Sequence, residues 1–224
     1  MILANTRGRL QAKDLELMVL LLSRGSASTR ARLERRLAEE GPDVLLDAPE
    51  LLERLLAVRT MLVPSEVLFF YALVRHALLK DGVNDRDLSD YLASLLLEFG
   101  RRDRAWRVDW NDDQRHGYML DILVDLEASG DPRRFKVMVH LGNYALWLAG
   151  LFPDYIAARR LRKAGPDLSY YEALGRRGYG MASDHVLADH YHLDGVFRVA
   201  AERFETVRGA LNGVSERLFP GGVH

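Results

Sequence analysis

The sequence contains no cysteine, and this absence excludes several classes of chemistry. Without thiolates the chain cannot hold a zinc–thiolate site or an iron–sulfur cluster, and it has no thiol nucleophile. Disulfide bonds are excluded as well, so folding does not require an oxidising compartment. We expect a cytoplasmic protein, although the absence of cysteine does not by itself establish that location.

Lysine is scarce, because only Lys13, Lys80, Lys136 and Lys163 stand against 27 arginines. We interpret this skew as the signature of a GC-rich coding genome, and hence of a bacterial source. The formal net charge is −1, so no overall field attracts the chain to nucleic acid or to an anionic membrane. Nucleic acid is therefore not an expected partner.

Long apolar runs are also missing. The run 15–22 is short and contains Glu16. The charge-free stretch 137–152 contains His140 and Asn143, and it is shorter than the roughly 20 residues that a membrane span needs. We interpret the longer stretch as a buried core helix, and we expect neither a membrane partner nor a targeting segment.

Proline and β-branched residues are few beside Leu, Ala, Arg and Glu, a bias that favours helix throughout. Capping residues and helix breakers divide the chain into about ten predicted helices. These are 12–23, 28–40, 49–61, 64–80, 84–99, 111–129, 132–151, 153–165, 169–180 and 183–218. The cluster Gly175, Gly178 and Gly180 is predicted to stop or kink the ninth of them.

The predicted fold is an all-α, single-domain, multi-helix bundle over residues 1–224 with a long C-terminal helix. Residues 1–60 are expected to form a looser helical layer, and 219–224 a flexible tail. Between the helices, Trp106, Val108 and Trp110 alternate with polar residues. This period of two predicts an extended connector with its apolar side on the bundle.

The predicted last helix carries the clearest periodic pattern. Its apolar residues are spaced alternately four and three apart: Leu193, Phe197, Ala200, Phe204, Val207, Leu211, Val214 and Leu218. The charge-free helix has the same spacing at Val137, Leu141, Tyr144, Leu148 and Leu151. Such seams indicate near-parallel helices in a bundle. We favour packing within the chain, the alternative being that the last seam serves a second subunit.

The start of the predicted last helix is rich in histidine. His185, Asp189 and His192 are spaced i, i+4 and i+7, so a continuous helix would place them on one face. With His116 from another helix they could bind a divalent metal. The alternative is a solvated polar face, which we favour because one face supplies too few ligands.

A second candidate site lies in the charge-free helix. His140, Asn143 and Trp147 follow one face of that helix, and His190 falls in phase with the last seam. If these residues meet, they form a small polar pocket with aromatic walls that would suit a ligand or a metal ion. The alternative is that a carbonyl, carboxylate or tyrosine hydroxyl satisfies each buried polar group locally, which is the commoner arrangement.

No nucleophile elbow or P-loop is present, and Gly178-Tyr179-Gly180 does not follow a strand. The leading prediction is therefore a non-enzymatic helical protein that binds another protein or itself. It depends on the last seam and on an arginine–tyrosine surface, in which Arg176 and Arg177 lie beside Tyr170, Tyr171 and Tyr179. The alternatives are a metal-binding helical-bundle protein or enzyme with His and Asp ligands, and a small-ligand-binding sensor with an aromatic pocket.

Overall fold

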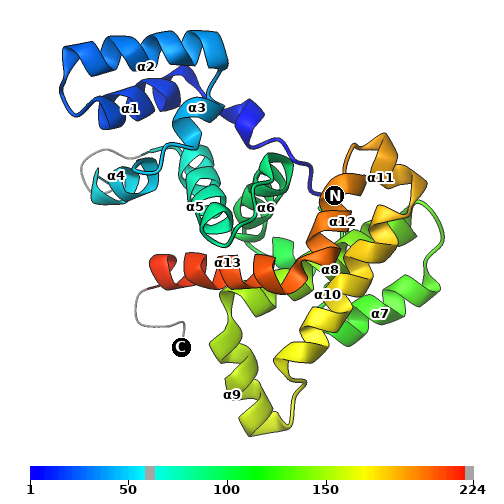
Figure 1. The fold of residues 1–224 in the computed structure, drawn as a ribbon. Coiled ribbons are helices and arrows are strands. Elements are labelled where there is room, and N and C mark those ends of the chain that lie inside the picture. Colours follow the sequence, from blue (N-terminus) through cyan, green and yellow to red (C-terminus); the bar gives the residue numbers. More distant parts are fainter. Residues whose placement is uncertain (59–63, 220–224) are drawn as a thin grey trace.

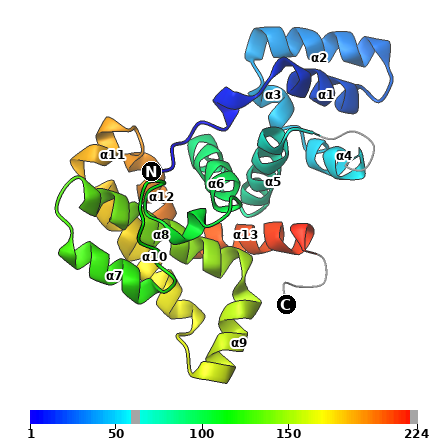
Figure 2. The same ribbon diagram turned by 180° about the vertical axis from the view of Figure 1, so that it is seen from behind.

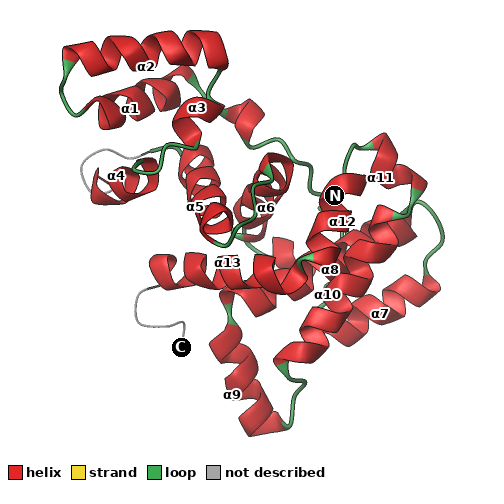
Figure 3. Ribbon diagram, in the orientation of Figure 1, coloured by secondary structure: helices red, strands yellow, loops and turns green. Residues whose placement is uncertain are grey.

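The computed structural model describes residues 1–58 and 64–219. Within these residues the chain forms thirteen α-helices, two 3-10 turns and no β-strand (Figure 1, Figure 3). The predicted all-α, multi-helix fold is therefore confirmed. In chain order the elements are η1 (Arg7–Arg9), α1 (Ala12–Ser23), α2 (Ala27–Glu40), α3 (Asp43–Leu46), α4 (Leu51–Val58), α5 (Glu66–Lys80), α6 (Arg86–Phe99), η2 (Arg104–Trp106), α7 (Met119–Ala128), α8 (Arg133–Leu151), α9 (Pro153–Lys163), α10 (Leu168–Ser183), α11 (Val186–His190), α12 (Asp194–Glu202) and α13 (Phe204–Leu218).

Helix α8 is the centre of the packing. Fifteen of its 19 residues are buried, and α7, α9, α10 and α13 pack against it. Helices α5 and α6 lie side by side, with α5 against α13 and α6 against α12, and α1 and α2 form a hairpin at the far end of the molecule (Figure 1, Figure 2). Within the described ranges, none of the helices combines the length and the apolar character that crossing a membrane requires. Of the tail predicted at 219–224, only Phe219 is among the described residues. Of the layer predicted at 1–60, residues 59 and 60 lie outside the described residues.

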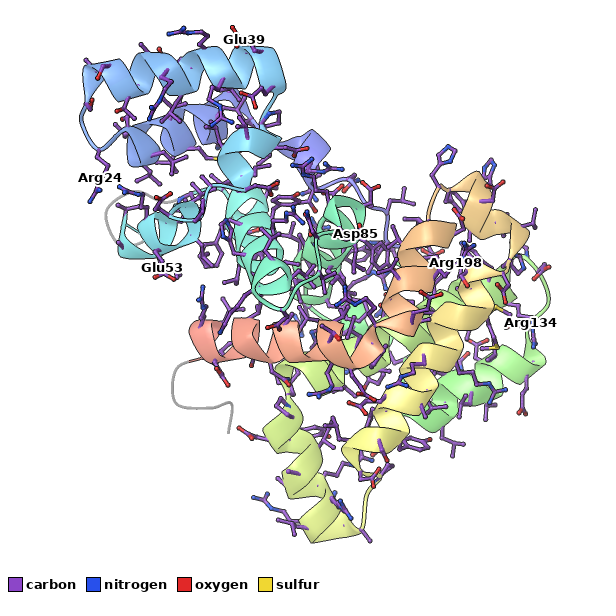
Figure 4. The ribbon with its side chains drawn as sticks, in the orientation of Figure 1. Arg24, Glu39, Glu53, Asp85, Arg134 and Arg198 are labelled. Carbon is purple, nitrogen blue, oxygen red and sulfur yellow. The ribbon has the colours of Figure 1, made fainter. Side chains whose placement is uncertain are left out.

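Side-chain caps fix where several helices begin. Asp85, labelled in Figure 4, accepts the backbone N–H of Leu88 at 2.8 Å at the start of α6. Three other helices begin in the same way, at Ser26, Ser65 and Asp167. The sequence predicted these starts one or two residues away, because several neighbouring residues could each act as the cap.

The glycines of α10 do not break the helix, which corrects the predicted stop. Helix α10 runs through all three of them to Ser183. A Cβ added at Gly178 would lie 2.6 Å from the backbone nitrogen of Gly142 in α8, and one at Gly175 would lie 2.2 Å from the ring of Phe204. These glycines therefore let α10 approach α8 and α13 closely, and packing outweighs their low helix propensity.

The prediction of one helix over 183–218 was wrong, because α11, α12 and α13 divide this segment. Helix α11 ends in a Schellman motif: Leu193 N–H donates to the Ala188 carbonyl at 2.8 Å, and His192 N–H donates to the Asp189 carbonyl at 2.9 Å. His192 takes the left-handed conformation, with φ 56°. Glycine usually occupies that position, so the sequence gave no sign of this stop.

The apolar seam nevertheless packs inside the chain. Its residues from Leu193 to Val214 are all buried, and α13 lies against α8 and α5. Internal packing of the seam, the favoured alternative, is therefore correct. The arginine–tyrosine surface expected around Arg176 and Arg177 is smaller than predicted, because Tyr171 and Tyr179 are buried.

Candidate functional site: an aromatic groove

An open groove of about 410 Å³ lies between the C-terminal half of α8, the start of α9 and the loop that precedes α7. Six aromatic side chains dominate its walls: Trp106, Tyr118, Tyr144, Trp147, Phe152 and Tyr155. Gly117 and Leu148 complete the lining. A concave aromatic surface of this size falls in the range of small-molecule sites.

Helix α8 builds the floor of the groove. Tyr144, Trp147 and Leu148 lie within a turn or so of one another, so their side chains project to the same side. The Trp147 ring stacks on Tyr144 at 6.0 Å and meets the edge of Phe152 at 4.7 Å between centroids. Phe152 caps the C-terminus of α8 and precedes Pro153, the first residue of α9, and α9 carries Tyr155 on the groove wall.

The loop wall differs from the sequence prediction. The helix predicted from Asn111 begins only at Met119, and the Asp121 carboxylate caps it by accepting the Tyr118 N–H at 3.0 Å. Two tertiary hydrogen bonds hold the preceding residues in a loop. His116 N–H donates to the Trp106 carbonyl at 2.7 Å, and the Tyr144 hydroxyl donates to the Gly117 carbonyl at 3.2 Å.

The connector before this loop was also predicted incorrectly. It contains the 3-10 turn η2 rather than an extended segment. Val108 is buried, but Trp106 and Trp110 are 41% and 46% exposed, so the three do not share an inward side. Trp106 lines the aromatic groove, whereas Trp110 lies over Arg101 and Arg104 on a separate surface.

Behind the groove, a buried polar network anchors the loop. His116 Nε2 lies 3.0 Å from Asp125 Oδ2, although its direction misses hydrogen-bond geometry and leaves both ring nitrogens without a hydrogen-bond partner. Arg133 donates to both oxygens of Asp125 and to Asp112 in the loop. Burial alone would raise the pKa of Asp125, but hydrogen bonds from Arg133 and Ser129 lower it below its usual value.

His140 lies one turn deeper in α8. Its ring stacks against Tyr144 at 6.0 Å and lies 6.3 Å from the His116 ring. Burial, reinforced by the charge of Arg104 and by His116, lowers the pKa of His140 well below its usual value, so the ring is neutral. Its Nε2 has no hydrogen-bond partner. His140 therefore supports the groove from behind and does not line it.

Asn143 is held by buried hydrogen bonds away from the groove. Its Oδ1 accepts hydrogen bonds from the hydroxyls of Tyr91 and Tyr179, each at 2.8 Å, and all three side chains are buried. This is the local satisfaction that the sequence left open as the alternative to a pocket. Asn143 therefore takes no part in the groove.

The structure thus separates the residues of the predicted ligand pocket. Trp147 lines the groove, His140 lies beneath it and Asn143 is held elsewhere. His190 was expected in the core but is exposed, because its phase was counted along a helix that ends there. The other five aromatic side chains of the groove were not identified, since three separate segments bring them together.

The residues of the predicted metal site do not share a helix face. His185 precedes α11 as its N-cap, Asp189 lies within α11, and His192 lies beyond its end. His185 instead stacks on Phe135 at 5.0 Å and lies 3.1 Å from Asp131, while His116 is buried beside Asp125. Across residues 1–58 and 64–219, no three His, Cys, Asp or Glu side chains are grouped to hold a metal ion.

A larger hollow of about 770 Å³ lies among α1, α2, α3 and α4. Its lining is rich in charge, and much of that charge is already paired: Arg36 with Glu40, and Arg86 with Asp47. A charged ligand would have to compete with these ion pairs for their side chains. The aromatic groove is therefore the stronger candidate site.

In comparisons with protein-family models, curated proteins and solved structures, no match to this chain is found. The assignment of a function therefore depends on the chemistry of the groove.

Proposed function

We propose that this chain is a non-enzymatic binding protein, a sensor or carrier, for a small molecule with a flat apolar body that enters the aromatic groove. The observation that carries the proposal is the concave wall of six aromatic side chains. Trp106, Tyr118 and Tyr155 leave between two fifths and three fifths of their surface in solvent. Covering such surface with a flat ligand removes apolar area from water and allows ring stacking.

Phenylnaphthylamine, an uncharged dye whose fluorescence rises in apolar surroundings, tests the proposal. We expect saturable binding, and we expect Trp106→Ala to weaken it by about tenfold, because one aromatic wall is lost. Trp110→Ala is the matched control, since Trp110 is equally exposed but does not line the groove. The proposal fails if the dye does not bind saturably, or if both substitutions have the same effect.

A protein-binding function is the second candidate, and a specific surface favours it. Leu120 and Val124 lie one turn apart on α7 and are 65% and 58% exposed. The buried seam no longer supports self-association, so this α7 face takes its place. Sedimentation of the wild type and of a Leu120→Lys/Val124→Lys variant would test it. If the wild type associates and the variant does not, the protein-binding function is favoured. If both proteins are monomeric at every concentration, this function is rejected.

A further inference from the structure

A second, smaller hollow continues the aromatic groove along α9. It has a volume of about 260 Å³. Tyr118 and Tyr155 line both hollows, so the two form one surface with an aromatic end and a second end on α9. Helix α9 projects away from the rest of the molecule in both views (Figure 1, Figure 2). All the residues that line the second hollow except Tyr118 belong to this helix.

The second end is positively charged. Arg159, Arg162 and Lys163 line it, and the Arg159 guanidinium lies 4.9 Å from the centre of the Tyr118 ring. Among the described residues no carboxylate pairs with any of the three cations. Many other arginines of the chain do have such partners, including Arg75, Arg133 and Arg208.

The helix dipole explains only part of this charge. Cations in a last turn stabilise a helix by interacting with its carbonyl end, which accounts for Arg160, Arg162 and Lys163. Arg159 lies before the basic residues of that last turn and is partly buried over Tyr118. Arg159 lines the smaller hollow and contacts Tyr118, which lines both hollows, and this contact is the feature that points to a ligand.

We infer that the ligand is a free, soluble amphipathic anion, whose flat apolar body lies in the aromatic groove and whose carboxylate, sulfate or phosphate group meets Arg159 and Arg162. This inference rests on the proposed function, since it specifies the charge of the molecule that the groove binds. Guanidinium groups suit such oxyanions because their planar donors match two oxygens at once.

Two dyes that differ only in an anionic group test the inference. Anilinonaphthalene sulfonate carries a sulfonate that phenylnaphthylamine lacks. We expect Arg159→Gln/Arg162→Gln to weaken binding of the sulfonate about fivefold, the effect of losing one half-buried and one exposed charge contact, and to leave the uncharged dye within about twofold. Added salt should weaken binding of the sulfonate in the wild type only, because exposed charges are screened.

A matched control removes two positive charges from residues that line neither the aromatic groove nor the second hollow. Arg160→Gln/Arg177→Gln changes exposed arginines of α9 and α10 that do not line either hollow. We expect it to leave both affinities unchanged. Circular dichroism of each variant confirms that the helices persist.

The outcomes separate the two proposals. If the uncharged dye fails to bind in a Trp106-dependent way, the proposed function fails and the inference with it. If it does bind, but both double variants weaken the sulfonate alike or neither does, only the inference is overturned. Phosphatidylglycerol vesicles test whether the anion is instead a lipid headgroup. Binding to vesicles that requires Arg159 and Arg162, without binding of the free sulfonate, would assign the site to a lipid headgroup and overturn a soluble ligand.

Discussion

Asn143 connects three helices through one atom. Its amide oxygen accepts a hydrogen bond from Tyr91 of α6 and another from Tyr179 of α10, and α8 carries the amide itself. Each phenol is fully buried, and burial raises the pKa of both hydroxyls, so they remain donors. A buried donor without an acceptor carries its full cost of desolvation, so the shared oxygen matters more than a single hydrogen bond would.

Asn143→Leu, which nearly keeps the side-chain volume, should therefore lower the free energy of unfolding by about 2–4 kcal/mol, because two buried phenols lose their acceptor. Urea denaturation measures the change. The triple variant Asn143→Leu/Tyr91→Phe/Tyr179→Phe removes the stranded donors together with the acceptor, and we expect it to recover much of the loss. A triple variant less stable than Asn143→Leu would contradict this explanation.

His140 gives the protein a pH dependence of known sign. Its pKa is lowered in the folded state, mainly by burial, whereas in the unfolded chain it is ordinary. As the pH falls below about 6.5, the unfolded state therefore takes up a proton that the folded state does not. Stability from this residue is complete above that pH and is lost as the solution becomes more acidic.

His140→Phe should remove this dependence, because the ring already lies among Phe99 and Tyr144 and its Nε2 has no partner. Between pH 7.5 and pH 5.5 the wild type should lose up to about 1.4 kcal/mol more stability than the variant. Comparing the two proteins cancels the contribution of His76, whose pKa burial also lowers. Parallel stability curves for the two proteins would show that His140 takes up its proton at the same pH in the folded and unfolded states, which contradicts a lowered pKa.

At the scale of the helix, two glycines of α10 have opposite effects on stability. Gly178 lies against the backbone of α8, so an added methyl group meets atoms that cannot turn aside. Gly180, two residues further along, has open space where its Cβ would be. Position on the helix face therefore decides whether a glycine weakens the helix or allows its packing.

Gly178→Ala should lower the free energy of unfolding by about 3 kcal/mol, because α8 and α10 must move apart. Gly180→Ala should raise it by about 0.5–1 kcal/mol, since alanine favours helix and nothing is displaced. Thermal or urea denaturation of both variants decides the matter. Equal effects from the two substitutions would indicate that helix propensity, and not contact with α8, governs both sites.

Local signals in the sequence were sufficient for most helices. Ser26, Ser65 and Asp85 act as caps within one or two residues of the predicted starts. The failures lie where distant contacts override local preference. Residues 111–118 resemble a helix start but form a loop because His116 is bound to Trp106, and α11 stops at a left-handed histidine where a glycine would have been recognised.

The candidate site shows the same limit at the scale of the molecule. Trp147 could be identified because it continues a face of one helix, and the periodic pattern predicted that face. Trp106, Tyr118 and Tyr155 could not, because only the turn between α8 and α9 and the loop before α7 bring them together. These three share a large exposed aromatic surface, and that exposure can be recognised only from the structure.

The groove also depends on a contact that lies outside it. Arg133, at the start of α8, joins the loop through Asp112 at 3.0 Å and α7 through Asp125 at 2.7 Å. That loop carries Gly117 and connects to Trp106, two residues of the groove wall. The ligand site should therefore respond to Arg133 although Arg133 does not line it.

Arg133→Gln removes both charge contacts, so amide hydrogen exchange in residues 107–117 should quicken by at least about tenfold, as the opening of this loop becomes less costly. Phenylnaphthylamine should bind about tenfold more weakly, because the wall is no longer held in place. Arg133→Lys should fall between, since an ammonium keeps one charge contact but cannot reach both carboxylates with a planar fork. Arg30→Gln breaks an exposed ion pair with Glu34 on α2 and serves as the control, with neither quantity expected to change. If Arg133→Gln leaves exchange and affinity as they are, then the hydrogen bonds of His116 and Tyr144 hold the wall without help from the charges.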